Sequence, residues 1–403
     1  MNVRRSEIAV IGGGIVGLAC ALRLQRAGHA VSVIDDDTDG QAASWGNAGH
    51  IATEQVAPLA SLAILRSAPR RLFVFGGPLD LRQPWRLGGW IARYLAACAP
   101  ARHRVGCHAL RALLADAMPA WREFVDALGA PQLLRESGHI VCWDRANAAR
   151  RGIAAWRTAD IGSATIAPLD RAMRERLDRV LARPPADAIA FSGTGQISDH
   201  TRLRDAARQG LVALGGQLLG GTVTGLSALP GDAWQVTLGG GDKRSFGCIV
   251  VCAGVRSRAL LAPFGWRVPL VAERGYHLHW ADHDWPEDLA PVAFEDRSII
   301  ATRFDRGLRL AGFVEYAPLE APADPRKWHT LERHAAELGL PVWGTPQRWF
   351  GARPTLPDYL PAIGQLPATP NLYYAFGHQH LGLTLAPVTA KIIEALVRGG
   401  CRL

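Results

Sequence analysis

The chain has 403 residues, 48% of them hydrophobic and 20% charged, and a net charge of +9 at pH 7. This composition excludes a disordered chain, and the length is enough for two domains that share a large core. The positive charge is mostly arginine and accompanies no nucleic-acid-binding motif, so we expect no nucleic-acid partner. The seven cysteines form no CxxC pair and no secretory signal is evident, which together predict a cytoplasmic protein.

The first elements are predicted to be a strand, a glycine-rich turn, a helix and a second strand. The strand at residues 8–11 leads into Gly12-x-Gly14-x-x-Gly17, and a strand at residues 30–34 ends on Asp35. In this setting the three glycines permit the turn, admit a pyrophosphate and let the helix pack on the strand. Asp35 is placed to accept hydrogen bonds from a ribose. The pattern predicts a dinucleotide-binding site and does not distinguish NAD from FAD.

The next stretch, QAASWGNAGH at residues 41–50, resembles the D-amino-acid oxidase superfamily of FAD-dependent oxidoreductases. The resemblance is strongest to bacterial D-amino-acid dehydrogenases, including the branch that acts on D-proline and D-hydroxyproline. It implies that FAD is held noncovalently. The FAD-binding residues that it implies are Gly12, Gly14, Ile15, Val16, Gly17, Asp35, Asp36, Ala43, Ser44, Asn47, Ala48, Gly49, Val223, Ala253, Gly254, Gly377, His378, Leu381, Gly382, Leu383 and Thr384.

Residues 59–104 combine eight arginines with five large aromatic side chains and a single acid, Asp80. Basic residues interleaved with aromatics are typical of a peripheral membrane contact. A solvated helical surface whose aromatics face the core explains the same pattern. We therefore expect a cytoplasmic protein, with contact to the inner face of the cell membrane as one of two interpretations of this stretch.

The middle of the chain predicts helices at 109–128, across most of 146–182 and at 201–214, and strands elsewhere. Residues 234–238 and 244–251 are expected to be paired strands. The fold class is α/β with α+β: a Rossmann-type FAD-binding domain and a substrate domain on a mostly antiparallel sheet. We assign 1–85, 186–265 and 350–403 to the first domain, and 86–185 and 266–349 to the second.

The C-terminal part carries the substrate-binding candidate. Gly351-Ala-Arg353-Pro, followed by Asp358 and Gly364, resembles the Gly-x-Arg-Pro pattern of the family, which implies that Arg353 binds the substrate carboxylate. A planar guanidinium suits this task. Tyr276 and His380 are the other catalytic candidates, while Arg274 and Arg303 are weaker ones. Many members have Gly-His-Gly where this chain has Gly377-His378-Gln379, so contacts to the flavin ring differ here.

The resemblance implies oxidative deamination of a D-amino acid by hydride transfer from Cα to the flavin. A cyclic substrate such as D-proline or cis-4-hydroxy-D-proline, and a quinone as electron acceptor, are the expected specifics. The alternatives are a glycine- or sarcosine-type oxidase that uses oxygen, and a noncatalytic flavin-binding subunit. The only lysines are Lys243, Lys327 and Lys391, and none obviously serves an oxygen reaction. We expect no metal, because His277-x-His279 has no completing ligand nearby.

Overall fold

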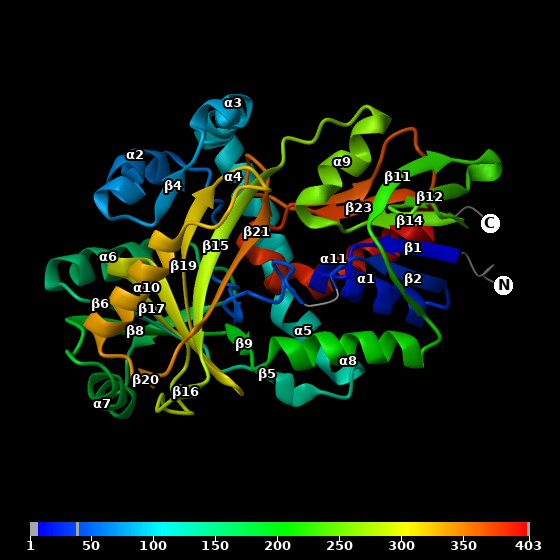
Figure 1. Ribbon diagram of the computed structural model, residues 1–403. Coiled ribbons are helices and arrows are strands. Elements are labelled where there is room, and N and C mark those ends of the chain that lie inside the picture. Colours follow the sequence, from blue (N-terminus) through cyan, green and yellow to red (C-terminus); the bar gives the residue numbers. More distant parts are fainter. Residues whose placement is uncertain (1–6, 38–39, 401–403) are drawn as a thin grey trace.

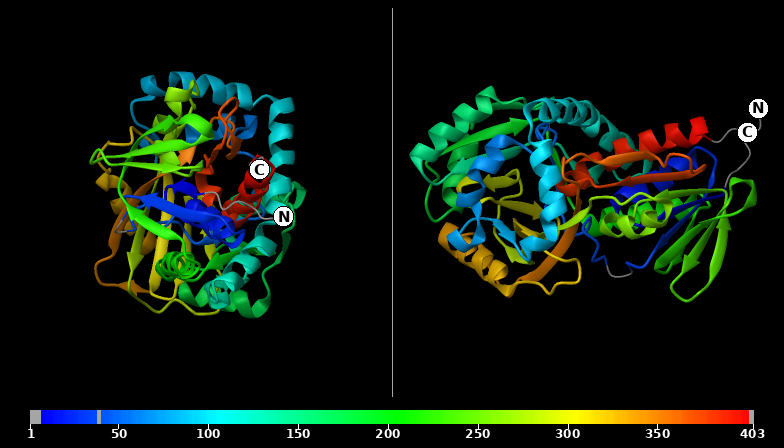
Figure 2. Two further views of the ribbon diagram at one scale, coloured as in Figure 1. Left: turned by 90° about the vertical axis from the view of Figure 1, so that its right-hand side faces the viewer. Right: turned by 90° about the horizontal axis from the view of Figure 1, so that it is seen from above.

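The computed structural model describes residues 7–37 and 40–400. One of the seven cysteines, Cys401, lies outside these residues. Two large sheets lie side by side in an elongated molecule (Figure 1 and the right view of Figure 2). This arrangement confirms the predicted fold class of a Rossmann-type sheet with a second, mostly antiparallel sheet.

The first sheet has six strands in the order β10-β2-β1-β14-β23-β22. All neighbours are parallel except the last pair. The strands are β1 (Glu7–Ile11), β2 (Ala30–Asp35), β10 (Gln217–Gly220), β14 (Cys248–Val251), β22 (Ala362–Gln365) and β23 (Leu372–Phe376).

The two faces of this sheet are covered by different layers because side chains alternate along each strand. Ile8 and Val10 of β1 pack with three helices: α1 (Ile15–Arg26), α8 (His200–Ala213) and α11 (Gly382–Gly400). Ala9 and Ile11 pack with the second layer. That layer is a small antiparallel sheet of β11 (Val223–Ala228), β12 (Trp234–Leu238) and β13 (Lys243–Phe246).

Helix α11 is the one described helix that is long and apolar enough to cross a membrane. In this structure 67% of its apolar stretch is buried, and its residues belong to the same core as α1. Its apolar character is therefore explained by its place in the core.

The second sheet has nine strands, eight of them in the order β21-β15-β19-β18-β17-β6-β8-β7 with β4 added beside β19. Two of its pairings are parallel, β17 with β6 and β19 with β4, and the others are antiparallel. The strands are β4 (Leu79–Leu81), β6 (His139–Trp143), β7 (Thr165–Pro168), β8 (Asp187–Ser192), β15 (Val271–Trp280), β17 (Val292–Phe294), β18 (Ile299–Phe304), β19 (Gly307–Tyr316) and β21 (Gln347–Thr355).

The remaining elements connect or cover the sheets. The small strand groups are β3 (His50–Ile51) with β9 (Gly195–Ile197) and β5 (Leu134–Arg135), and β16 (Asp282–His283) with β20 (Val342–Trp343). The other α-helices are α2 (Leu62–Arg71), α3 (Gly88–Ala97), α4 (Pro100–Ala115), α5 (Ala117–Ala127), α6 (Ala146–Thr158), α7 (Arg171–Val180), α9 (Ser257–Leu261) and α10 (Pro325–Leu338).

The stretch 146–182 is mostly helical, as expected, with strand β7 between α6 and α7. Two other predicted elements were wrong in detail. The helix expected at 109–128 is divided at Asp116. The strand expected at 244–251 is divided at Gly247: its first half pairs with β12, while its second half joins β1 in the parallel sheet. Local sequence cannot show this last division, because both halves are strand-like and only their partners differ.

The predicted domain limits do not coincide with membership of the sheets. Strands β4, β8 and most of β21 lie in segments assigned to the FAD-binding domain, yet they belong to the nine-stranded sheet. Helix α5 lies in a segment assigned to the substrate domain, yet its Trp121 and Phe124 pack in the core beside α1. Strand pairing between distant segments decides membership here, and local composition does not reveal it.

Candidate active site

The glycine-rich turn has the backbone geometry that its sequence predicts. Gly12 has a φ of +105°, which other residues rarely adopt, and a Cβ there would collide with the carbonyl oxygen of Cys252. A Cβ at Gly17 would collide with the carbonyl oxygen of Gly12. Both glycines are therefore required by close backbone packing between β1, α1 and the chain after β14.

The N-terminus of α1 presents backbone donors to the cavity. Gly14 is the N-cap residue and supplies no side-chain cap, while the Ile15 N–H donates to Ser44 Oγ at 3.1 Å. The unpaired N–H groups and the positive end of the helix dipole favour an anion at this position. Ser44 therefore adds a hydroxyl beside a ready anion-binding turn.

Two carboxylates lie at the end of β2. Asp35 accepts hydrogen bonds from the backbone N–H groups of Gly13 and Asp37. Asp36 Oδ2 accepts from Thr222 Oγ1 at 2.8 Å and from Arg256 Nη1 at 2.6 Å. Partial burial alone would raise the pKa of Asp36, but these two donors lower it, so this carboxyl is ionised at neutral pH.

One cavity of about 1140 Å³ joins this turn to the predicted substrate residues. Most of the predicted residues line it: Gly12, Gly14, Val16, Asp35, Asp36, Ala43, Ser44, Asn47, Ala48, Val223, Ala253, Gly254, Tyr276, Arg353, His378, His380, Gly382 and Leu383. Six predicted FAD-binding residues lie behind the wall: Ile15, Gly17, Gly49, Gly377, Leu381 and Thr384. Their side chains, where they have any, pack or bond within the protein, as the Thr384 hydroxyl does to the Ala52 N–H.

Arg353 lies on β21 with its guanidinium in the cavity. Its side chain is 27% exposed, and Nη1 donates to Glu273 Oε1 at 3.1 Å. Glu273, directly across on β15, is held in turn by the hydroxyls of Tyr316, Tyr359 and Thr355. A Cβ at Gly275 would collide with the guanidinium, so this glycine makes room for it. Arg353 is thus oriented from behind and keeps donors free for a ligand.

His380 lies close to Arg353 and is uncharged at neutral pH. Burial is the main cause that lowers its pKa to about 4; Arg353 adds to the shift, while Glu273 and Glu54 oppose it. Its Nε2 lies 2.5 Å from Gln55 Oε1. His378 is also buried and its pKa is lowered to about 4 by burial, with Nε2 2.9 Å from Thr389 Oγ1. Both imidazoles therefore offer hydrogen bonds and no charge.

The structure does not support Tyr276 as a contact for a substrate carboxylate. Its hydroxyl bonds to Glu315, to Arg274 and to the Asp324 N–H, inside a network that also contains the fully buried Lys327. Side chains alternate along β15, so Tyr276 and Arg274 project to the face opposite Glu273. Arg274 is therefore also outside the site, and Arg303 pairs with Glu287.

Sequence reasoning missed the acidic and histidine residues that complete the cavity wall. Four of them are Glu273, His50, Glu54 and His139. Alternation would have indicated Glu273, because the strand pairing that places Arg353 in the cavity places Glu273 beside it. His50 is the last residue of the stretch 41–50 that resembles the family, and Glu54 follows it four residues later. His139 comes from a distant strand, and no local signal joins it to them.

The histidines considered as metal ligands have other partners. His277 Nδ1 lies 3.0 Å from the Gly46 carbonyl oxygen, and His279 Nε2 lies 2.7 Å from that of Arg306. Among the described residues, two other clusters have metal-like spacing: His50 with Glu54 and His139, and Asp80 with Glu315 and Asp324. In the second, the Lys327 ammonium already contacts all three carboxylates.

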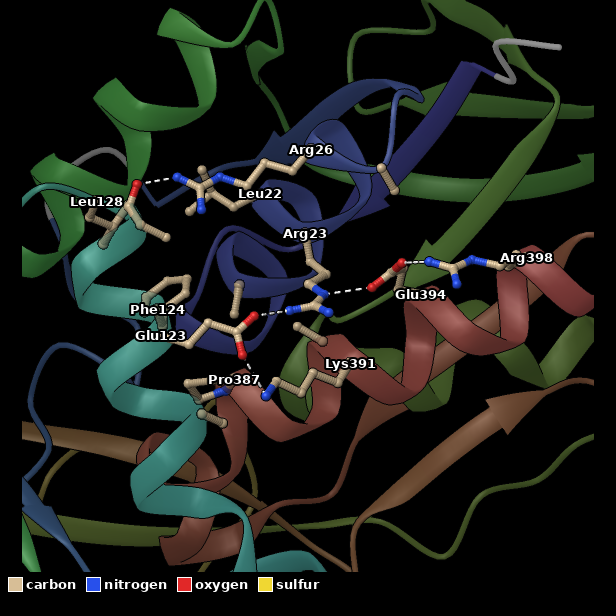
Figure 3. Close-up of a pocket in the computed structure, with 15 residues that line it drawn as sticks. Leu22, Arg23, Arg26, Glu123, Phe124, Leu128, Pro387, Lys391, Glu394 and Arg398 are labelled. Atoms are coloured by element: carbon tan, nitrogen blue, oxygen red, sulfur yellow. Dashed lines mark hydrogen bonds and ion pairs between the residues drawn. The ribbon is translucent and has the colours of Figure 1, made fainter. Parts of the chain in front are cut away.

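A second, smaller cavity of about 410 Å³ lies on the outer surface between α1, α5 and α11 (Figure 3). Its charged side chains bind one another: Glu123 contacts Arg23 and Lys391, and Glu394 contacts Arg23 and Arg398. These ion pairs therefore connect the three helices. Among the residues labelled in the figure, Arg26 is the one charged side chain without an ion pair, and it donates to a backbone carbonyl.

Comparison with known proteins decides the family. The family model described as DAO, FAD dependent oxidoreductase, matches residues 7–396. The chain belongs to the DAO family of FAD-dependent oxidoreductases. A protein of Bradyrhizobium diazoefficiens named D-amino-acid oxidase is 30% identical over 98% of this chain and 95% of its own length. A protein of Cereibacter sphaeroides named D-amino acid dehydrogenase is 28% identical over 98% of this chain and 92% of its own length.

Solved structures show the same fold at lower identity. Iminodiacetate oxidase from Chelativorans superposes with a TM-score of 0.71 at 20% identity, covering 97% of this chain and 95% of that one. Glycine oxidase from Geobacillus kaustophilus gives 0.70 at 21% identity, covering 98% and 95%. The family match and the two relatives confirm the predicted superfamily, the enzyme class and the cofactor FAD.

The cavity of this DAO-family enzyme fits FAD. The glycine turn and Ser44 would hold the pyrophosphate, since a side chain at Gly12 or Gly17 is sterically excluded and Gly14, the N-cap residue of α1, has no side chain to cap the helix start. Asp35 and Val223 line the end suited to adenosine, and Asn47, Ala48 and Gly382 line the part suited to the flavin. The individual roles of these residues stay predictions, but their positions along one cavity are compatible with them.

Proposed function

We propose that this enzyme is a D-amino-acid dehydrogenase. The observation that carries the proposal is the guanidinium of Arg353, which is held by the buried carboxylate of Glu273 in the cavity that begins at the glycine turn. A partly buried arginine that keeps donors free suits a carboxylate ligand. The relatives named D-amino acid dehydrogenase, at 28–30% identity over nearly the whole chain, support the D-amino acid as substrate class.

The chain positions the substrate and supplies hydrogen bonds. Arg353 binds the carboxylate, and Glu273 fixes the guanidinium so that the bound geometry is restricted before the reaction. FAD, when bound, accepts the hydride from Cα. The N-terminus of α11 reaches the same cavity at Gly382, where its dipole favours developing negative charge. His380 is neutral and can donate a hydrogen bond without adding charge.

We propose a cyclic secondary amine, such as D-proline or cis-4-hydroxy-D-proline, as the substrate, with a cyclic imine as the product. The support is the resemblance to bacterial D-amino-acid dehydrogenases, among which some enzymes prefer cyclic secondary amines. His378 and His380 line the cavity that would hold such a ring. Tyr276 also lines the cavity, but its hydroxyl bonds within the protein, as does the His277 ring nitrogen.

The electron acceptor is proposed to be a quinone. No lysine lines the cavity formed by the described residues. The Lys327 ammonium is buried among Asp80, Glu315 and Asp324, and Lys391 pairs with Glu123 on the outer cleft. A second candidate is an oxidase that uses oxygen, which the 30% identical relative named D-amino-acid oxidase favours.

An exposed apolar surface supports the proposal of a lipid-soluble acceptor. Eleven large hydrophobic side chains are exposed among the described residues, and seven of them lie between Leu62 and Val105. Val74, Phe75 and Trp85 are each more than 70% exposed. In the same segment Ile64, Arg71 and Pro78 line the cavity, so one stretch of chain forms both an apolar surface and a cavity wall.

The charge of this segment matches an anionic membrane. Six of its arginines are exposed and make no ion pair with any described residue: Arg66, Arg70, Arg86, Arg93, Arg102 and Arg104. Its one acid, Asp80, binds Lys327. Helices α2 and α3 lie together at the edge of the molecule away from β1 and β2 (Figure 1). We propose that this surface contacts the inner face of the cell membrane.

The substrate and acceptor are tested by anaerobic reduction of the bound flavin. D-proline, cis-4-hydroxy-D-proline, D-alanine, glycine, sarcosine and L-proline are compared by kcat/KM, first with a soluble quinone and then with oxygen. The proposal expects both cyclic D-compounds to rank first and quinone to react far faster than oxygen. Preference for D-alanine would reject only the cyclic substrate, and preference for L-proline or sarcosine would reject D-specificity. Rapid peroxide formation without quinone reduction would establish the oxidase.

A further inference from the structure

Glu54 is a buried carboxylate on the cavity wall whose one side-chain partner among the described residues is His50. The residue is 3% exposed, and its Oε1 lies 3.3 Å from His50 Nε2. Its Oε2 is buried and has no hydrogen-bond partner among residues 7–37 and 40–400. Unpaired buried carboxylate oxygens are costly, so native structures normally supply them with a donor. A donor for Glu54 Oε2 would therefore come from a ligand bound in the cavity.

Two histidines, His50 and His139, lie beside Glu54. His139 Nδ1 is 3.0 Å from Thr194 Oγ1, and its ring lies 4.4 Å from the His50 ring. Burial is the main cause that lowers the pKa of His139 to about 3, so this imidazole is neutral. Burial alone would raise the pKa of Glu54, but the field and hydrogen bond of His50 lower it to about 2, and Glu54 is therefore ionised.

Arg353 and Glu54 belong to the same end of the cavity. Gln55, the neighbour of Glu54, contacts His380, and both Arg353 and Glu54 act on the pKa of that imidazole. Arg353 is paired with Glu273 and Glu54 with His50, so a substrate carboxylate bound to Arg353 adds a negative charge that none of these four side chains offsets. A ligand with a positive group beside its carboxylate corrects this imbalance, and an amino acid has that charge pattern.

We propose that Glu54 binds the ammonium group of the substrate while Arg353 binds its carboxylate. The two side chains then hold the two charged ends of one amino-acid zwitterion and restrict how Cα is presented. This inference rests on the proposed amino-acid substrate and adds a residue that none of the predicted sites included. The ligand chemistry is a primary or secondary ammonium next to a carboxylate, and a secondary ring ammonium has two N–H donors for the available acceptors.

The test compares two ring-shaped ligands in the FAD-loaded enzyme and in Glu54→Gln. D-proline carries the ammonium, and (R)-tetrahydrofuran-2-carboxylate has an ether oxygen in its place and accepts hydrogen bonds only. The dissociation constant of D-proline comes from anaerobic stopped-flow flavin reduction, and that of the ether from its perturbation of the flavin spectrum. Glu54→Gln should weaken D-proline about 10- to 100-fold, as expected for loss of a charged hydrogen bond. The ether should bind the variant as well as, or better than, the wild type.

Asp160→Asn is the matched control. Asp160 lines the same cavity but pairs with Arg111 at 2.6 Å, so its loss removes a carboxylate without removing the acceptor for an ammonium. In Asp160→Asn, the ratio of the dissociation constants of D-proline and the ether should equal the ratio in the wild type. FAD content and Tm of both variants show whether the fold is kept.

The outcomes separate this inference from the proposed function. Equal binding of D-proline by the wild type and Glu54→Gln, or equal weakening of both ligands, would overturn it. A stoichiometric divalent metal in the wild type that Glu54→Gln loses would also overturn it, because the carboxylate would then be a metal ligand. If Glu54→Gln does not hold FAD, the wild type decides: it should bind D-proline at least tenfold more tightly than the ether, and equal affinities would reject the role of Glu54. A wild-type flavin that no D-amino acid reduces would overturn the proposed function and this inference together.

Discussion

At the scale of single residues, Arg353 carries the substrate assignment. Removing a charged partner that binds a carboxylate away from water costs roughly 2–5 kcal/mol. Arg353→Ala should therefore lower kcat/KM, and the change in activation free energy calculated from the two kcat/KM values should be about that large. The FAD content should be unchanged. Arg348→Ala is the control, because Arg348 lies on the same strand but pairs with Glu332 on an exposed surface. Equal kcat/KM in the wild type and Arg353→Ala would remove Arg353 from the site.

Buried histidines predict how stability depends on pH. Burial lowers the pKa of His378 and of His380 to about 4, from an unfolded value near 6.5. Between these values the unfolded chain binds protons that the folded protein does not, so stability is full above pH 6.5 and falls as the pH drops toward 4. Each shift corresponds to an upper limit of about 3 kcal/mol at 1.36 kcal/mol per unit.

Urea unfolding between pH 8 and pH 4 measures this dependence. His378→Gln, which keeps a polar side chain near Thr389, should reduce the slope of stability against pH below 6.5. His329→Gln is the control, since that residue lies on α10 outside the cavity. The same slope in the wild type and His378→Gln would show that His378 does not resist protonation.

At the scale of elements, one buried lysine joins α10 to the nine-stranded sheet. Lys327 of α10 has no exposed surface, and its ammonium contacts Asp80 of β4, Glu315 of β19 and Asp324 at the start of α10. Lys327→Met would leave these carboxylates without their shared cation. We expect a loss of roughly 3–5 kcal/mol in the free energy of unfolding.

Lys391→Met is the matched control for this change. Lys391 pairs with Glu123 at the outer cleft, where both side chains are at least 36% exposed, so its loss should cost less than about 1 kcal/mol. Chemical denaturation of the two variants gives the comparison. Equal losses of unfolding free energy in the two variants would show that burial does not increase the contribution of Lys327 to stability.

At the scale of the whole molecule, the exposed apolar and basic segment predicts membrane binding. The protein should bind vesicles that contain anionic phospholipid, and the affinity should fall as salt rises. Arg66→Gln with Arg70→Gln should weaken binding roughly 30-fold, at about 1 kcal/mol per arginine. Co-sedimentation with vesicles measures both effects.

The apolar part of this contact has its own control. Phe75→Ser with Trp85→Ser should reduce binding to the same vesicles, because both side chains are more than 70% exposed and would enter the interface. Trp343→Ser removes a side chain that is 50% exposed outside this segment, and it should bind as the wild type does. Equal binding by all variants would favour the solvated helical surface.

The sequence by itself determined the features that depend on neighbouring residues. The glycine turn, α1 and the acid after β2 are local, because each glycine answers a backbone constraint within one strand–turn–helix unit. The strands and helices at both ends of the chain follow from periodicity, and Arg353 was found from a short motif. These features also carried the resemblance that the family comparison confirmed.

Only the tertiary structure decided which side chains share the cavity. Glu273 and Tyr276 are three residues apart, yet strand alternation and the pairing with β21 place one beside Arg353 and give the other's hydroxyl to Glu315. His139 reaches Glu54 from a distant strand, and the halves of residues 244–251 join different sheets. These outcomes depend on long-range strand pairing, whose register no local pattern specifies, because the same strand-like sequence fits more than one partner.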